Sequence, residues 1–198
     1  MNQLSQLAKL YNTDKIIHGY TDIYFNALNH LKNQSLTLLE IGVGGYTNPT
    51  QGGESLKMWS DFFPNAHIHG VDVYIKTIPG NFQIHQADQT DKYFFENLIQ
   101  LIGEPTIIID DASHINPLTI KTFEILFPLL KSNGIYIIED TQTAYIEKDF
   151  AGDPASKNPN TITNYLFSII NHLNQFNDNN NPKSIQFFKQ LAIIYKWK

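Results

Sequence analysis

The chain has 198 residues, of which 42% are hydrophobic and 17% charged, and its formal net charge of −5 is typical of one globular domain with a sizeable core. All fourteen basic residues are lysines and they form no basic run, which argues against nucleic-acid binding and against bidentate guanidinium recognition of phosphate. The absence of cysteine excludes disulfides, zinc–thiolate sites and cysteine nucleophiles.

The N-terminal residues MNQLSQLAKLYNTDK lack the apolar core of a signal peptide, and no apolar run reaches the ~18 residues of a membrane span. We therefore expect a cytoplasmic protein with no membrane span. The arginine-free composition, rich in asparagine, lysine and isoleucine, is typical of a bacterium with an AT-rich genome.

Short apolar runs alternate with helix-compatible segments along most of the chain. We expect a helical leader over residues 1–34 and a main domain over residues 35–198. Strands are predicted at Leu36–Ile41, Ile68–Val73, Phe82–His85, Thr106–Ile109 and Ile135–Ile138, and helices at Glu54–Phe63, Asp91–Leu101, Pro117–Leu130 and Thr161–Phe176. Strands that are apolar throughout indicate parallel pairing with both faces covered.

The last apolar runs are separated only by Lys189 and Gln190, which predicts a closing antiparallel hairpin. The fold class is therefore α/β: a three-layer α/β/α sandwich of mainly parallel strands, with ligands beyond their carboxyl ends. Two polar stretches interrupt it. Asn174–Ser184 is interpreted as a solvated loop, and Glu147–Asn160 as a lid in which Gly152 and Asp153 favour a mobile turn.

A glycine-rich turn follows the first predicted strand. Gly42, Gly44 and Gly45 allow a tight turn and close approach of a ligand to the main chain. The dinucleotide fingerprint would place a third glycine where Thr47 stands, and Glu40 suits a cationic ligand group better than a pyrophosphate. A simple strand-to-helix turn is an equally good interpretation of the motif alone.

Acidic residues at the next two strand ends suit a nucleoside. Asp72 can accept hydrogen bonds from both ribose hydroxyls, and its long spacing from Gly42 is explained by the polar insert at residues 46–53. Asp88 and Gln89 follow the third strand, where an adenine edge could be met. Helix or turn capping is the alternative for both aspartates.

Two apolar strands end in paired acids, in IIIDDASHIN (residues 107–116) and IYIIED (residues 135–140). If these strands are neighbours, the carboxylates of Asp111, Glu139 and Asp140 converge. Hard oxygen ligands without cysteine favour Mg²⁺, or Mn²⁺ and Ca²⁺, over zinc, and a cation would relieve the repulsion between the acids. The alternative is that these acids cap the following helices.

The motifs LLEIGVGGY, IIIDDASHIN, FPLLKSNGIYIIEDTQTAY and SIQFF together resemble class I S-adenosylmethionine-dependent methyltransferases. More narrowly, the chain is similar to the metal-dependent sugar O-methyltransferases of macrolide biosynthesis, of the mycinamicin and tylosin type, from about Ser35 onward. The resemblance implies a Rossmann-like methyltransferase sheet. The large N-terminal domain of those enzymes is missing here and a short leader stands in its place, so substrate and oligomeric state do not carry over.

The resemblance assigns Asp111, Glu139 and Asp140 to the metal, which is Mg²⁺ or alternatively Mn²⁺. His114 is the proposed general base, because it stands beside Asp111 and an imidazole can take the proton of a metal-bound sugar hydroxyl. Cofactor binding is expected from Glu40, Gly42, Gly44, Gly45, Tyr46, Ser55, Asp72, Asp88, Gln89 and Asp110. Gln142, Tyr145 and Tyr20 are expected on the acceptor side, with residues 141–160 as the lid loop. The leader could fold over the cofactor or acceptor, whereas Thr13 and Asp14 could equally cap a helix.

The expected function is O-methylation of a hydroxyl on a sugar, glycan or glycosylated natural product, with S-adenosylmethionine and a divalent cation. Two alternatives remain: a cephalosporin hydroxylase-like protein of the same fold, and a non-catalytic nucleoside-binding domain. A nicotinamide dehydrogenase is disfavoured by Thr47 and Glu40. The expected partner is a small-molecule or glycan acceptor and not nucleic acid, and a homo-oligomer is compatible with the sequence.

Overall fold

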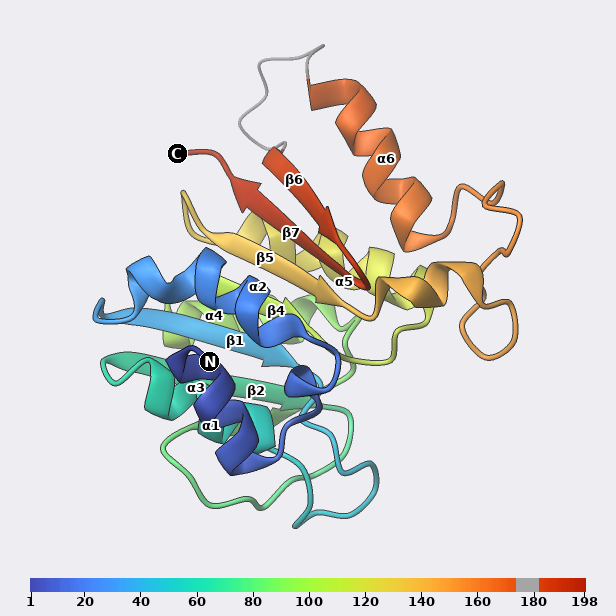
Figure 1. Cartoon of the computed structure of the whole chain (residues 1–198). Coiled ribbons are helices and arrows are strands. Elements are labelled where there is room, and N and C mark those ends of the chain that lie inside the picture. Colours follow the sequence, from blue (N-terminus) through green and yellow to red (C-terminus); the bar gives the residue numbers. More distant parts are fainter. Residues whose placement is uncertain (174–181) are drawn as a thin grey trace. The chain divides into compact units, whose positions relative to one another are not determined.

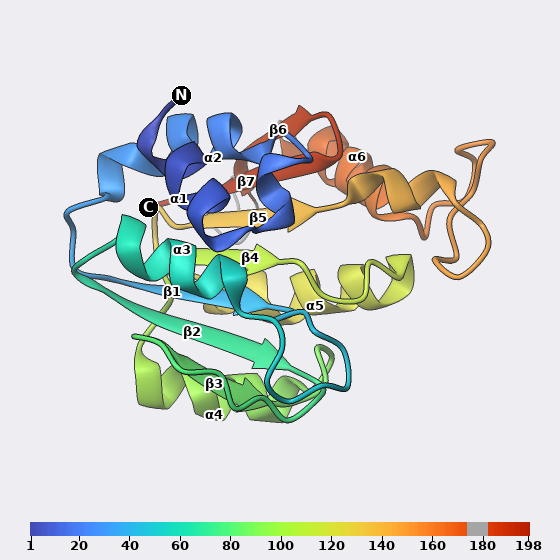
Figure 2. The ribbon, with the colours of Figure 1, turned by 60° about the horizontal axis from the view of Figure 1, so that its bottom comes forward.

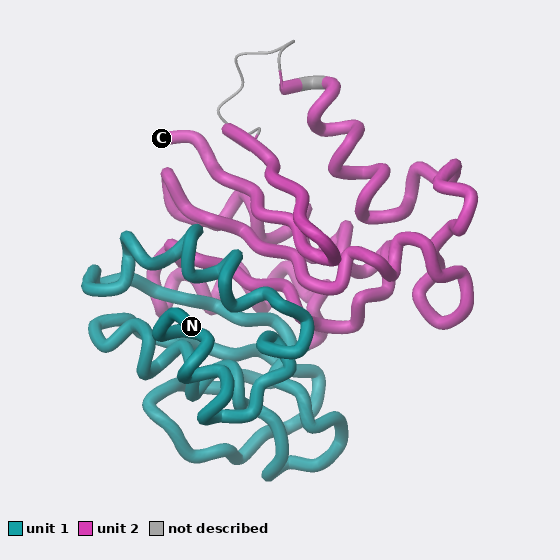
Figure 3. The backbone as a smooth tube through the Cα atoms, viewed as in Figure 1, with its two compact units in different colours: residues 1–87 teal, residues 88–198 magenta. Residues whose placement is uncertain are grey.

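The computed structural model describes residues 1–173 and 182–198, which divide into two compact units, Met1–Ala87 and Asp88–Lys198 (Figures 1 and 3). Most of the polar loop predicted at Asn174–Ser184 lies outside the described residues. Within the described part, every helix is too short or too polar to cross a bilayer.

Three parallel strands form the sheet of the first unit. They are β1 (Leu36–Ile41), β2 (Ala66–Asp72) and β3 (Gln83–Gln86), in the spatial order β3-β2-β1. Every residue of β1 is buried, as expected for an apolar strand covered on both faces. By contrast, no residue of β3 is fully buried, so the sequence prediction was right about this strand and wrong about its burial.

The leader of the first unit is helical, as predicted. It comprises α1 (Gln3–Tyr11), the 3₁₀ turn η1 (Asp14–Ile16), α2 (Tyr20–Leu28) and the 3₁₀ turn η2 (Asn29–Leu31). α1 packs against α2 and against α3 (Glu54–Phe62), and Figure 2 shows α1 and α3 on the same face of β1 and β2. That residues 1–34 form a cap on a separate domain stays a prediction.

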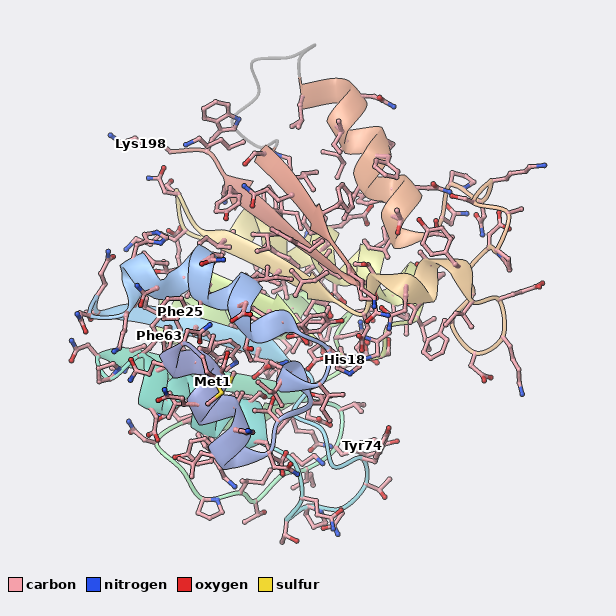
Figure 4. All side chains as sticks on the ribbon, viewed as in Figure 1. Met1, His18, Phe25, Phe63, Tyr74 and Lys198 are labelled. Atoms are coloured by element: carbon pink, nitrogen blue, oxygen red, sulfur yellow. The ribbon has the colours of Figure 1, made fainter. Side chains whose placement is uncertain are left out.

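Aromatic side chains make up much of the core beneath these helices. The rings of Tyr24 and Trp59 lie 5.1 Å apart edge to face, and Phe62 contacts both Phe25 and Phe63, which are labelled in Figure 4. Ring pairs of this kind stabilise a core beyond the effect of their buried area. They join α2 of the helical leader to α3.

The described residues of the second unit form four strands in the order β4-β5-β7-β6. β4 (Ile107–Asp110) and β5 (Ile135–Glu139) are parallel, whereas β6 (Pro182–Phe188) and β7 (Leu191–Lys196) form the predicted antiparallel hairpin. The helices are α4 (Lys92–Ile102), α5 (Asn116–Leu129), the 3₁₀ helix η3 (Thr141–Tyr145) and α6 (Ile162–Leu173). Where the described residues allow a comparison, predicted and observed bounds agree to within two residues.

Candidate functional site

Glu40 near the end of β1 is fully buried and has partners from two other segments of its unit. Its Oε1 lies 3.2 Å from Nζ of Lys15, which is also fully buried, and its Oε2 accepts a hydrogen bond of 2.8 Å from Oγ of Ser55. Lys15 is held in η1, where Oγ1 of Thr13 accepts a hydrogen bond of 3.1 Å from its backbone N–H. The sequence predicted a cationic ligand group for Glu40, and the leader itself supplies a cation.

The turn after β1 requires glycine. Gly42, Gly44 and Gly45 have φ angles of 94°, 75° and 72°, which L side chains rarely adopt. A Cβ at Gly45 would also lie 2.1 Å from the carbonyl oxygen of Gln51. These three positions carry no side chain of their own, and at Gly45 the main chain of Gln51 takes the space that a Cβ would need.

Asp72 at the end of β2 accepts hydrogen bonds from the main chain of two turns. Its Oδ2 accepts a hydrogen bond of 3.0 Å from Val43 N, and its Oδ1 accepts one of 2.9 Å from Tyr74 N. These are turn-capping contacts, which the sequence analysis gave as the alternative to ribose binding for Asp72. Each carboxylate oxygen has a second lone pair, so the same side chain retains capacity for ribose hydroxyls. Tyr74, labelled in Figure 4, lies on the loop after β2 and is partly exposed.

Lys76 organises the polar insert after the glycine turn. Its Nζ donates hydrogen bonds of 2.6, 3.2 and 3.3 Å to the carbonyl oxygens of Tyr46, Asn48 and Gln51. The side chain of Tyr46 is 86% exposed, so its assignment to the cofactor stays a prediction. Sequence reasoning missed Lys76 because nothing in the local pattern marks it.

Asp88 and Gln89 open the second unit, and both are engaged within it. Oδ1 of Asp88 accepts hydrogen bonds of 2.7 and 2.6 Å from the backbone N–H and hydroxyl of Thr90, which lower the pKa of the carboxyl group. Gln89 donates through Nε2 to Oγ1 of Thr122 at 2.9 Å and accepts through Oε1 from Ser113 N at 3.3 Å. Gln89 thereby connects α5 with the turn that carries the acidic motif.

Asp110, the last residue of β4, is almost fully buried. Burial raises the pKa of its carboxyl group to about 7, although a backbone hydrogen bond from Ala112 opposes the shift. The hydroxyl of Tyr136 lies 3.5 Å from its Oδ2, and burial beside this carboxyl raises the pKa of that tyrosine well above its usual value. Asp110 is therefore buried within its unit, whereas the side chains of Asp111 and Asp140 are 21% and 20% exposed.

The ends of β4 and β5 do meet, as the sequence required for a metal site. The two strands pair in parallel with Asp110 opposite Ile138. Ligand atoms of Asp111, His114 and Asp140 all lie within 4.8 Å of one another, and an oxygen of Glu139 lies within the same distance of Asp111. Nε2 of His114 is 3.8 Å from Oδ1 of Asp111 and 3.6 Å from Oδ2 of Asp140.

Two residues of this cluster have an unusual backbone. His114 has a φ of 56° and Asp140 a φ of 54°, in the left-handed region that most side chains avoid. Strain of this kind costs of order 1–3 kcal/mol and is concentrated at functional sites, where the surrounding structure holds it. Both residues place a ligand atom within 4.8 Å of Asp111, and no sequence pattern predicted their unusual backbone.

The acids and the histidine fit a hard divalent cation. Carboxylate oxygens are the donors that Mg²⁺ and Mn²⁺ prefer, and the histidine beside them is available for proton transfer. Oε1 of Gln142, beside the cluster, is buried without a hydrogen-bond partner, while its Nε2 donates to Oδ1 of Asp140 at 3.2 Å. A buried acceptor without a donor is costly, so the donor set and this oxygen both indicate a bound group at this place.

The three residues expected on the acceptor side have different surroundings. Gln142 and Tyr145 lie on η3, directly after Asp140, and Tyr145 is about half-exposed. Tyr20 is fully buried in the first unit and stacks on His18 at 5.3 Å. Its assignment to the acceptor stays a prediction, and the contacts that the structure shows for this ring are packing contacts within its unit.

The comparisons identify sugar O-methyltransferases as relatives. The chain is 41% identical over 146 residues to mycinamicin VI 2''-O-methyltransferase of Micromonospora griseorubida, covering 72% of this chain and 37% of that protein. It is 39% identical over 145 residues to a rhamnosyl tetracenomycin-C 2'-O-methyltransferase of Streptomyces olivaceus, covering 72% of this chain and 38% of that protein. No protein-family model matches the chain.

A solved structure gives the same result for the fold. The mycinamicin methyltransferase MycE, in complex with Mg, S-adenosylhomocysteine and mycinamycin VI, matches 100% of this chain and 55% of its own with a TM-score of 0.92 and 33% identity. The predicted resemblance and fold class are thereby confirmed: a Rossmann-like, mainly parallel sheet with antiparallel C-terminal strands. The chain spans less than half the length of these two curated relatives, at 37% and 38%.

Proposed function

We propose that this chain carries the cofactor and metal sites of an S-adenosylmethionine-dependent, divalent-metal-dependent O-methyltransferase that acts on a sugar hydroxyl. The observation that carries the proposal is the convergence of Asp111, His114 and Asp140 after β4 and β5. Its context is homology to sugar O-methyltransferases and likeness to an enzyme solved with Mg and S-adenosylhomocysteine.

In this proposal the cofactor lies against the glycine turn, where Gly42, Gly44 and Gly45 carry no side chain of their own. Ser55 donates a hydrogen bond of 2.8 Å to Glu40, and these two residues provide the polar side chains next to the turn. Asp72 is assigned to the ribose hydroxyls. Tyr46, Asp88, Gln89 and Asp110 complete the assigned set. The cofactor supplies an electrophilic methyl group on a sulfonium.

The acids at the ends of β4 and β5 would hold the metal and orient the acceptor. Asp111, Glu139 and Asp140 are the assigned ligands, and a divalent cation held there would lower the pKa of the acceptor hydroxyl. His114 takes the hydroxyl proton on Nε2 as the oxygen attacks the methyl group. Nε2 of His114 lies 3.8 Å from Oδ1 of Asp111 and 3.6 Å from Oδ2 of Asp140, beside the assigned metal ligands. The products are the methyl ether, S-adenosylhomocysteine and one proton on His114.

The acceptor is proposed to be a deoxysugar unit of a glycosylated small molecule. The relatives are named for methylation of rhamnosyl 2'- and 3'-hydroxyls and of an olivosyl 3-hydroxyl. The buried Oε1 of Gln142 can accept a hydrogen bond from a neighbouring sugar hydroxyl, and Tyr145 beside it provides a half-exposed ring. When one hydroxyl of a vicinal pair is bound by Gln142, the position of the other hydroxyl is fixed, and this would determine which oxygen is methylated.

The location, the partners and the domain organisation of the protein are part of the same proposal. A cytoplasmic enzyme that turns over a small-molecule acceptor, without a nucleic-acid partner, fits the dispersed lysines and the net charge of −5. Residues 1–34 are proposed to act as a cap on residues 35–198, with residues 141–160 beside the acceptor. A homo-oligomer is compatible with this proposal.

Two measurements test the proposal. Titration of S-adenosylhomocysteine into the purified chain should show micromolar binding with Mg²⁺ and again with excess EDTA. Methyl transfer from S-adenosylmethionine to mycinamicin VI or to methyl α-L-rhamnopyranoside should then require Mg²⁺ or Mn²⁺. The absence of S-adenosylhomocysteine binding under both conditions would overturn the proposed function.

A further inference from the structure

Asn116, the last residue of the motif IIIDDASHIN, is fully buried at the start of α5 and joins three other segments. Its Nδ2 donates hydrogen bonds to the carbonyl oxygens of Thr143 at 3.0 Å and Phe150 at 2.9 Å. Its Oδ1 accepts a hydrogen bond of 2.7 Å from the N–H of Ile162. Its own backbone N–H also donates to Phe150 O at 3.0 Å.

These partners belong to η3, to the polar loop that follows it, and to the first residue of α6. We call residues 146–161 the acceptor loop. The loop is also held directly to η3, since Asp153 N donates to Ala144 O at 2.8 Å. A Cβ at Gly152 would lie 2.3 Å from Thr143 O and 2.6 Å from Ile146 N, so this glycine is required for close packing.

The second half of the acceptor loop is organised by Asp153. Its carboxylate accepts backbone hydrogen bonds from Ala155 at 2.8 Å, Lys157 at 2.6 Å and Asn158 at 2.7 Å. These bonds lower the pKa of the carboxyl group. The loop therefore has a built conformation from its first residues to the start of α6.

Asn116 stands between this loop and the candidate catalytic group. It follows His114 by two residues, and that histidine already has a strained φ of 56°. The helix to which Asn116 binds, η3, carries Gln142 and Tyr145. One amide group thus connects the turn of the histidine with both residues assigned to the acceptor.

We propose that Asn116 is a positioning residue, which fixes η3 and the acceptor loop relative to His114 and thereby determines the affinity for the sugar acceptor. The acceptor part rests on the proposed function. The anchoring part does not, because it follows from hydrogen bonds within one unit. A buried amide with all these groups satisfied leaves unpaired main-chain groups when it is removed.

Limited proteolysis tests the anchoring without any acceptor. The loop contains two trypsin sites, after Lys148 and after Lys157. Asn116→Ala should increase the rate of cleavage at these sites at least about tenfold in the native protein, as should Gly152→Ala from the opposite side of the contact. The matched control is Thr119→Val, because Thr119 is also buried in α5 but its hydroxyl bonds only within its own helix, to Ile115 O at 3.3 Å. Cleavage of Asn116→Ala at the wild-type rate would overturn the proposal.

Steady-state kinetics with mycinamicin VI test the consequence for the acceptor. Asn116→Ala should raise KM for the acceptor at least about tenfold and change the Kd for S-adenosylhomocysteine less than twofold. A role in folding alone would lower the amount of active enzyme without changing KM, so an unchanged KM beside faster cleavage also overturns the proposal. If the alanine variant does not fold, Asn116→Asp replaces it, since the aspartate keeps the acceptor for Ile162 N but loses both donors. Failure of the wild-type protein to transfer methyl would count against the proposed function alone.

Discussion

Lys15 and Glu40 form a fully buried ion pair with Nζ and Oε1 3.2 Å apart. The pair joins the helical leader to the end of β1, immediately before the glycine turn assigned to the cofactor. A carboxylate at this strand end therefore has a structural partner within its own unit.

Replacement of Lys15 should destabilise the chain strongly. Lys15→Met leaves the Glu40 carboxylate buried without its cation, which typically costs about 3–5 kcal/mol and lowers the Tm of a chain of this size by about 10 °C. Thermal unfolding checks this. The double variant Lys15→Met/Glu40→Leu should recover most of the loss, because it buries no unpaired charge. A single-variant loss below about 1 kcal/mol would contradict the interpretation.

Gly45→Ala should weaken S-adenosylhomocysteine binding at least about tenfold, because a Cβ meets the carbonyl of Gln51 at 2.1 Å and the φ is 72°. Gly19→Ala is the matched control, since Gly19 has a φ of 75° and no atom within 4 Å of the added Cβ. The control should lose about 1 kcal/mol of stability and retain binding. Calorimetric titration of both variants decides, and equal affinities would exclude a role for this close approach.

His114→Asn should retain S-adenosylhomocysteine binding and lose turnover by about 10²–10⁴-fold, the usual contribution of a general base. Asparagine is chosen because it tolerates the left-handed backbone at this position. His67→Gln, at an exposed position of β2, is the control and should behave as wild type. Turnover of His114→Asn at the wild-type rate would refute the base assignment.

Metal binding should be visible as thermal stabilisation. Mg²⁺ at about 100 times its Kd should stabilise the wild-type chain by about 2.7 kcal/mol, and EDTA should reverse the gain. Asp111→Asn should abolish the shift, whereas Asp149→Asn, at an exposed position of the same unit, should preserve it. The metal assignment fails if Asp111→Asn shows the full Mg²⁺-dependent shift.

The pair of His69 and His85 predicts a loss of stability in weak acid. Their ring nitrogens are 3.2 Å apart, and burial lowers the pKa of His69 to about 4 and also lowers that of His85. In the unfolded chain these imidazoles take up protons near pH 6.5, whereas in the folded state they do so only at lower pH. The free energy of unfolding therefore has its full value above about pH 6.5 and falls toward pH 4. The loss from His69 should be roughly 1–2 kcal/mol after allowance for its solvent contact.

Urea unfolding at pH 7.5 and pH 5 measures this loss. His69→Leu should reduce the difference between the two pH values, and His67→Gln should leave it unchanged because His67 is exposed. A pH difference in His69→Leu as large as in the wild type would show that other groups cause the acid sensitivity.

The elements of the fold were predictable because their signals are local. The strand at Leu36–Ile41 is mostly apolar and was predicted with the bounds that the structure shows, and the helix predicted at Asp91–Leu101 is shifted by one residue at each end. The meeting of the acids at the ends of β4 and β5 was predicted only on the condition that these strands are neighbours, and the parallel pairing of the two strands meets that condition.

The contacts that hold the site were not predictable in the same way. Asn116 binds residues 27, 34 and 46 positions away, and no periodicity encodes such partners. From the sequence, Lys15 had no role of its own. Its role as the ion-pair partner of Glu40 depends on the fold, which brings η1 close to β1. The capping contacts of Asp72 and Asp88 were weighed from the sequence, but their geometry could come only from the fold.

The way in which the acceptor loop is held has a consequence for how such a chain can diversify. Asn116 and Asp153 bind main-chain N–H and C=O groups, which nearly every amino acid provides. The path of the loop is thus maintained while exposed positions such as Lys148 and Ala155 are exchanged. If the proposed function holds, new acceptor preferences can therefore be selected from libraries of the exposed side chains of this loop without redesign of its backbone.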